Sequence, residues 1–123
     1  MKKTIFSFFI AMFFSTLALA QFSMDSDGKT IRNSSNSSCG RIDSDGRTVR
    51  NGNNSSVGQV DSDGKTIRNG SNSSVLRIDG NDIRNTSTGS VIAKMSDVTS
   101  AIRGAKNEAI YVALWWFIVK GNH

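Results

Sequence analysis

The sequence predicts a mainly β fold: four pseudo-symmetric β-hairpin repeats of about 18 residues in a closed, barrel-like ring, followed by a C-terminal α-helix. Two consecutive segments, residues 42–59 and 60–77, are nearly identical and read IDSDGRTVRNGNNSSVGQ and VDSDGKTIRNGSNSSVLR. Short β-branched runs in them alternate with turns rich in Asn, Asp and Gly, as in β-hairpins. The last part of the chain lacks this motif and is apolar, which predicts the helix.

The repeat has one register through most of the chain. Its units open with an apolar residue followed by Asp, and each carries a β-branched residue followed by Arg. The openers are Met24, Ile42, Val60 and Ile78, and the β-branched residues are Ile31, Val49, Ile67 and Ile83. The fourth unit is shortened at Asp79-Gly80-Asn81-Asp82, where a change of length falls in a turn and is tolerated.

One unit predicts a strand, a turn, a return strand and a second turn. In the third unit the strands are residues 65–68 and 75–78, so four units predict about eight strands. Asn69-Gly70 predicts a hairpin turn with positive φ, and Gly64 predicts a left-handed residue in the DSDG turn.

A single unit buries only two or three apolar side chains, which does not offset the conformational entropy lost on ordering it. We therefore expect several units to share one core. Gly40 and Gly58 lie inside return strands, where glycine indicates the close approach of another backbone.

The units, of the form Gly-x-Ile-Arg-Asn followed by Val-x-Gly-Arg-Ile-Asp, with an apolar C-terminal segment behind them, resemble the bacterial four-fold β-flower proteins. The resemblance covers roughly residues 24–119. It implies a flower of hairpins around a four-fold axis, with a helix packed near the centre, and it implies no activity.

The N-terminus predicts export. Residues 1–20 have a basic start, an apolar stretch and an Ala18-Leu19-Ala20 end, which is typical of a signal peptide. Removal of this peptide lowers the formal charge from +5 to +3, because two lysines leave with it. We expect a periplasmic, outer-envelope-associated or secreted protein. Cys39 has no cysteine partner and predicts a small apolar filler, with a reactive thiol as the alternative.

We expect residues 21–95 to form the β-hairpin domain and residues 96–123 to supply a C-terminal helix packing on or into it. Ala101 to Val119 predicts that helix, with only Gly104 interrupting it. An apolar helix of this kind is buried, or it contacts a membrane surface or a partner protein through Tyr111, Trp115 and Trp116.

Two sets of charged residues are candidate sites. Arg32, Arg50, Arg68 and Arg84 form a possible anion-binding ring, with pairing to aspartates as the favoured alternative. The DSDG turns predict structural turns rather than calcium loops, because an EF-hand needs further ligands. A looser cation site would require the aspartates at positions 25, 43, 61 and 79 to converge.

No set of catalytic residues is recognisable, because His123 is the only histidine and ends the chain. We expect no enzyme activity, cofactor or metal. Nucleic acid is disfavoured because the repeats contain no aromatic residue on which bases could stack. The predicted function is an exported, non-catalytic structural or binding module whose ligand or partner, a protein or an envelope component, is unknown. The alternatives are an envelope-associated protein docking through its aromatic helix, and a self-assembling fibre subunit of the curli type.

Overall fold

The structure is a computed structural model, and it describes residues 21–122. The expected signal peptide, residues 1–20, lies outside the described residues. Ten short strands form one sheet in the order β10-β1-β2-β3-β4-β5-β6-β7-β8-β9. The strands are β1 (Phe22–Met24), β2 (Thr30–Arg32), β3 (Ser38–Ile42), β4 (Thr48–Asn51), β5 (Ser56–Val60), β6 (Thr66–Asn69), β7 (Ser74–Asp79), β8 (Asp82–Asn85), β9 (Val91–Lys94) and β10 (Ile102–Arg103). The mainly β prediction is confirmed.

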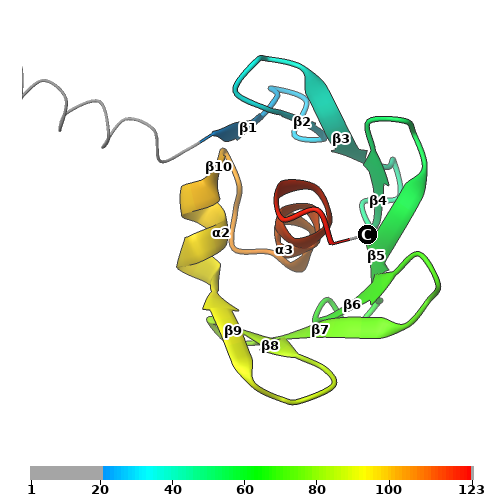
Figure 1. Cartoon of the computed structure of the whole chain (residues 1–123), viewed down its shortest axis with the longest axis vertical. Coiled ribbons are helices and arrows are strands. Elements are labelled where there is room, and N and C mark those ends of the chain that lie inside the picture. Colours follow the sequence, from blue (N-terminus) through cyan, green and yellow to red (C-terminus); the bar gives the residue numbers. More distant parts are fainter. Residues whose placement is uncertain (1–20, 123) are drawn as a thin grey trace, which may run out of the picture.

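The hairpins share one local geometry. The pairs β2–β3, β4–β5, β6–β7 and β8–β9 are antiparallel, and each has a register shift directly after its β-branched residue. A bulge at this point bends the strand and increases its twist. Repetition of the bend carries successive hairpins around a common centre, as Figure 1 shows.

The DSDG turns agree with the prediction, because Gly28, Gly46 and Gly64 have φ values of +70°, +72° and +69°. The turn predicted at Asn69-Gly70 is present, because the N–H of Asn72 donates to the carbonyl oxygen of Asn69 at 2.9 Å. The predicted positive φ at Asn69 and Gly70 is wrong, since the residue with positive φ is Asn72, at 68°. The side chain of Asn69 explains the difference. Its Oδ1 accepts hydrogen bonds from the backbone N–H groups of Ser71 and Ser73, which organises a longer loop.

The predicted ring required a sheet closed by hydrogen bonds, and this expectation is not met. Its end strands are β9 and β10, and helix α2 (Met95–Ala101) connects them. In Figure 1, α2 lies at the side of the molecule where the hairpins leave a gap. A helix therefore completes the circle that the strands begin.

The predicted continuous helix from Ala101 to Val119 is also wrong. The chain leaves α2 to form β10, turns at Gly104 with φ +90°, and resumes as α3 (Ala109–Leu114) and the π-helix η1 (Trp115–Val119). Parallel pairing of Ile102 with Phe22 and the left-handed glycine stop the first helix. The segment formed by α3 and η1 then lies at the centre of the hairpins (Figure 1).

The core lies between the hairpins and this central segment. Ile31, Val49, Ile67 and Ile83 are fully buried there, together with Leu114 and Phe117. The strand glycines allow close approach, as expected. A Cβ atom at Gly40 would lie 2.9 Å from the carbonyl oxygen of Arg50 and 3.0 Å from the side chain of Ile118. In residues 21–122 no helix has the length and apolar character needed to cross a membrane.

Candidate ligand pocket at the turn end of the hairpins

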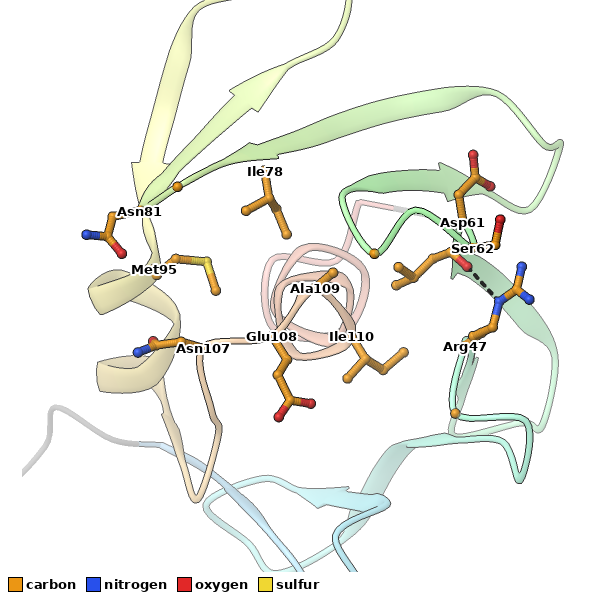
Figure 2. A pocket seen from close by; sticks show the side chains of 14 residues that line it. Arg47, Asp61, Ser62, Ile78, Asn81, Met95, Asn107, Glu108, Ala109 and Ile110 are labelled. Carbon is orange, nitrogen blue, oxygen red and sulfur yellow. Dashed lines mark hydrogen bonds between the residues drawn. The ribbon is translucent and has the colours of Figure 1, made fainter.

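A pocket of about 570 Å³ opens where three turns meet the start of α3. The turns belong to β3–β4, β5–β6 and β7–β8, and Figure 2 shows the pocket around Ala109. It is lined by Gly46, Arg47, Val60, Asp61, Ser62, Gly64, Ile78, Gly80, Asn81, Met95, Asn107, Glu108, Ala109 and Ile110. Its volume is in the range of small-molecule sites, about 300–1,000 Å³.

The inner wall of the pocket is apolar. Val60, Ile78, Met95 and Ala109 are buried and come from four different elements or their ends. Each has its position because it also belongs to the shared core, so the wall is held by the packing of the whole domain. Such a wall binds an apolar group by removing it from water.

The rim of the pocket is polar and exposed. Arg47 donates from Nε to the carbonyl oxygen of Val60 at 3.1 Å, which holds its guanidinium beside the opening. Glu108 directly precedes α3, and its carbonyl oxygen accepts a hydrogen bond from the N–H of Tyr111. Over residues 21–122, neither the Arg47 nor the Glu108 side chain forms an ion pair. Both charges are therefore free to meet a ligand.

Sequence reasoning did not identify this pocket. Its residues come from three separate turns, two of which carry the DSDG motif, and from the C-terminal segment, so no single motif marks the pocket. The one local signal is that Glu108, the only glutamate in the chain, stands directly before an apolar run.

Ion pairs fix the side chains of the four repeat arginines. Arg32 donates from Nε to Asp25 at 2.8 Å, and Arg50 and Arg68 pair in the same way with Asp43 and Asp61 at 2.9 Å. Arg84 repeats the arrangement with Asp79 at 3.3 Å. The Nη1 group of each arginine donates to a carbonyl oxygen of the following turn, at Asn36, Asn54, Asn72 and Gly89. Each arginine thus joins two turns, and an anion would have to compete with these bonds; anion binding by the series stays a prediction.

A second set of aspartates stabilises the DSDG turns. Asp63 Oδ1 accepts hydrogen bonds from the N–H groups of Lys65 and Thr66, and Oδ2 accepts from the Thr66 hydroxyl. These bonds lower the pKa of Asp63 from 3.8 to about 2, with the Lys65 N–H as the largest cause. The pKa of Asp45 is also lowered to about 2, chiefly by the N–H of Arg47.

The aspartates do not converge on a cation. In the part of the chain that the structure describes, no group of three or more His, Cys, Asp or Glu residues is placed to hold a metal ion. Asp25, Asp43, Asp61 and Asp79 lie in separate turns, each paired with its own arginine. The looser cation site considered above is therefore wrong.

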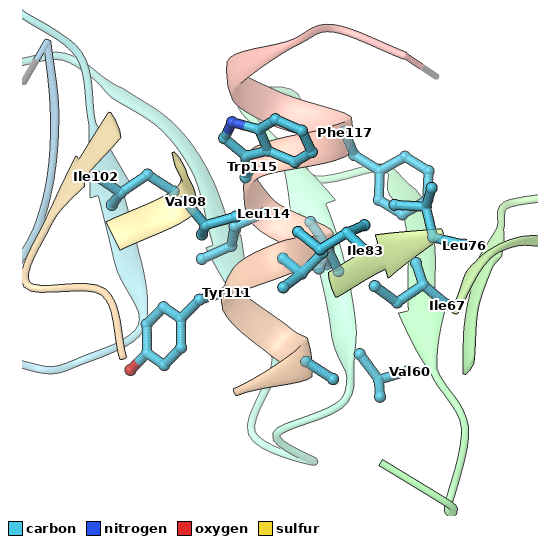
Figure 3. Packing of buried hydrophobic residues seen from close by; sticks show 14 of the residues in the cluster. Val60, Ile67, Leu76, Ile83, Val98, Ile102, Tyr111, Leu114, Trp115 and Phe117 are labelled. Atoms are coloured by element: carbon cyan, nitrogen blue, oxygen red, sulfur yellow. The ribbon is translucent and has the colours of Figure 1, made fainter. Parts of the chain in front are cut away.

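The C-terminal aromatic residues lie mostly in the core. Figure 3 shows Tyr111 and Trp115 on the central segment among buried side chains, and they are only 7% and 6% exposed. The docking surface expected from Tyr111, Trp115 and Trp116 is thus wrong for its first two members, because both side chains are buried in the core. Trp116 is partly exposed, and its ring centroid lies 6.1 Å from that of Trp115.

Cys39 is partly buried, and its thiol lies 3.5 Å from the carbonyl oxygen of Ile31, to which it donates. Burial raises the pKa of this thiol, so less of the reactive thiolate is present at neutral pH. This environment favours the apolar-filler interpretation.

Comparison with known proteins agrees with this architecture. No significant match is found among curated proteins or among solved structures. The family model described as "5-fold beta-flower protein" matches residues 20–117. The four-fold count expected from the sequence is a different count within the same kind of fold, because only four units carry the Asp and Arg-Asn motif. The chain therefore belongs to the 5-fold β-flower protein family.

Proposed function

We propose that the chain is an exported, non-catalytic binding module whose ligand occupies the pocket at the turn end of the hairpins. The observation that carries this proposal is the combination of a buried apolar wall with a rim of opposite charges. Apolar pockets with a few polar groups at the opening are the usual form of small-molecule sites. Export rests on the signal-peptide pattern of residues 1–20, and N-terminal sequencing of the protein from the cell envelope or medium tests it.

The pocket favours a small amphipathic ligand with opposite charges. Val60, Ile78 and Met95 would contact its apolar body. The Glu108 carboxylate would bind an ammonium group, and the Arg47 guanidinium would bind a carboxylate. A short apolar peptide has this chemistry, and so leucyl-leucine is a suitable probe.

Titration with leucyl-leucine, followed by amide NMR shifts, tests the proposal. We expect saturable shifts for residues 46–47, 61–64 and 108–110. Arg47→Gln and Glu108→Gln should each weaken binding several-fold, since each removes one charged contact. Lys29→Gln is the matched control, because Lys29 has the same place in the first DSDG turn but does not line the pocket. Absence of saturable shifts, or equal effects of Lys29→Gln, would contradict the assignment.

The two alternative functions have less support. Tyr111 and Trp115 are buried and so are not available to dock the aromatic helix on a membrane or a partner. A curli-type fibre needs repeats stacked in an open series, whereas here the hairpins surround a central helix (Figure 1). Vesicle co-sedimentation and thioflavin fluorescence of the exported chain would detect these two behaviours.

We further infer that the four sequence units occupy four positions of a five-fold pseudo-symmetric arrangement, with α2 and the β10–β1 pair in the fifth. Support comes from the family description and from α2 joining the two end strands of the sheet. An experimental structure tests the count: successive hairpins should be related by about one fifth of a turn, and rotation by one quarter would contradict it.

A further inference from the structure

The open edge of the sheet at β9 combines exposed apolar residues with missing strand pairing. β9 pairs only with β8 among residues 21–122. Val91 and Ile92 are 41% and 40% exposed, and they are the exposed large hydrophobic residues of the described range, 21–122. Exposed edge strands are templates for further pairing, and proteins usually protect them with charges or proline. Val91, Ile92 and Ala93 provide neither, and the one charged residue of β9, Lys94 at its end, is paired with Asp82 at 2.6 Å.

A groove of about 500 Å³ adjoins this edge. It lies between β9, α2 and the end of the central segment. Its lining residues are Ile92, Ala93, Asp97, Ala101, Trp115, Trp116 and Lys120. Lys120 Nζ lies 5.5 Å from the centroid of the Trp115 ring. Trp116 is partly exposed and lines this groove together with Ile92, so the two side chains belong to one apolar surface.

We propose that β9 pairs antiparallel with β9 of a second copy of this chain, about a two-fold axis at Ile92. This arrangement places Val91 opposite Ala93 of the second copy, so apolar side chains meet at the centre. Lys94, the only charged residue of the strand, lies opposite the uncharged Ser90 of the second copy, which avoids repulsion between like charges. The backbone N–H of Lys94 already donates to Asp97 Oδ2, so the new strand pairing centres on Val91, Ile92 and Ala93.

The groove is also complementary to itself in charge. Its lining includes one acidic residue, Asp97, whose Oδ2 accepts a hydrogen bond from the N–H of Lys94 at 2.8 Å, and one basic residue, Lys120. A two-fold axis at the adjoining strand brings the groove of one copy beside that of the other. In that arrangement Lys120 of each copy faces the groove that contains Asp97 of the other copy. The charges of the two grooves are then complementary across the two-fold axis.

Sedimentation equilibrium of the exported chain tests the proposal, and we expect a monomer–dimer equilibrium. Ile92→Lys introduces facing charges at the axis and should weaken association at least tenfold. Asn53→Lys is the matched control, because it adds the same charge on the exposed β4–β5 loop. Thermal unfolding of both variants checks that a loss of association is not a loss of folding. A monomer at every concentration, or a dimer unaffected by Ile92→Lys, overturns the proposal.

A cross-linking experiment tests the register. In a Cys39→Ser background, Ile92→Cys should form a disulfide between copies on mild oxidation, because a residue at a two-fold axis faces itself. Asn53→Cys in the same background should not. Dimerisation with no cross-link at position 92 would show that another surface joins the copies, and it would also overturn the proposal.

Discussion

The ring of Phe117 packs directly on the backbone of Gly58. A Cβ atom at Gly58 would lie 2.2 Å from Cε2 of Phe117 and 2.7 Å from the carbonyl oxygen of Arg68. Both distances are far below van der Waals contact, so no side chain fits there. The central helix and β5 are therefore matched to each other at this point.

Gly58→Ala should destabilise the protein by about 1–3 kcal/mol, the usual cost of overpacking a core. The reason is that either the Phe117 ring or the β6 backbone must move. Urea unfolding measures the loss. Gly52→Ala is the control, since its new methyl group would meet its nearest neighbour at 3.6 Å. Equal stability of the two variants would contradict the packing described.

Phe117→Ala should reduce the free energy of unfolding by about 3–5 kcal/mol, as expected for a large, fully buried aromatic residue. It removes the side chain that fills the space between the helix and β5. Ile92→Ala, at an exposed apolar position, should cost less than about 0.5 kcal/mol in the monomer. A small effect at Phe117 would mean that the hairpins do not depend on the central helix.

Acid should weaken the protein through the DSDG turns. The folded pKa values of Asp45 and Asp63 are about 2, below the ordinary value of 3.8. Their contribution to stability is therefore complete above pH 3.8 and is lost as the pH falls through about 2. Urea midpoints measured across this interval should fall, and the fall should be smaller in the Asp45→Asn, Asp63→Asn variant. An identical pH dependence in both proteins would refute this role.

Arg68→Lys should lower stability by less than about 1 kcal/mol, because the ion pair with Asp61 is partly exposed. Lysine retains the charge but cannot donate to both Asp61 and the carbonyl oxygen of Asn72, as the guanidinium does. Chemical denaturation measures the loss, which should shrink at high ionic strength if it is electrostatic. An effect independent of salt would show that the lost geometry, and not the charge, matters.

The sequence predicted what depends on local periodicity. The inward positions Ile31, Val49 and Ile67 were readable because each recurs at a fixed spacing between polar neighbours. The left-handed glycine of the DSDG turn was readable for the same reason, since its conformation is set within a few residues.

Features that depend on distant contacts were not predicted. Ile102 leaves the helix because it pairs with Phe22, which lies far away in the chain. The pocket was missed because Arg47 and Glu108 come to line one cavity only after the hairpins have surrounded the central segment. The positive φ of the Asn69-Gly70 turn was assigned to the wrong residue for a local reason, namely that the Asn69 side chain organises a longer loop.

The residues that face the central segment differ from one hairpin to the next. Hairpins of nearly identical sequence would accept the helix equally well at several angular settings, and the folded chain would then be a mixture of rotational isomers. Glycine at positions 40 and 58 faces Ile118 and Phe117, whereas the corresponding positions carry Leu76 and Ala93. Only one orientation places the bulky residues over the glycines, and this mismatch selects a unique native state from a nearly degenerate scaffold.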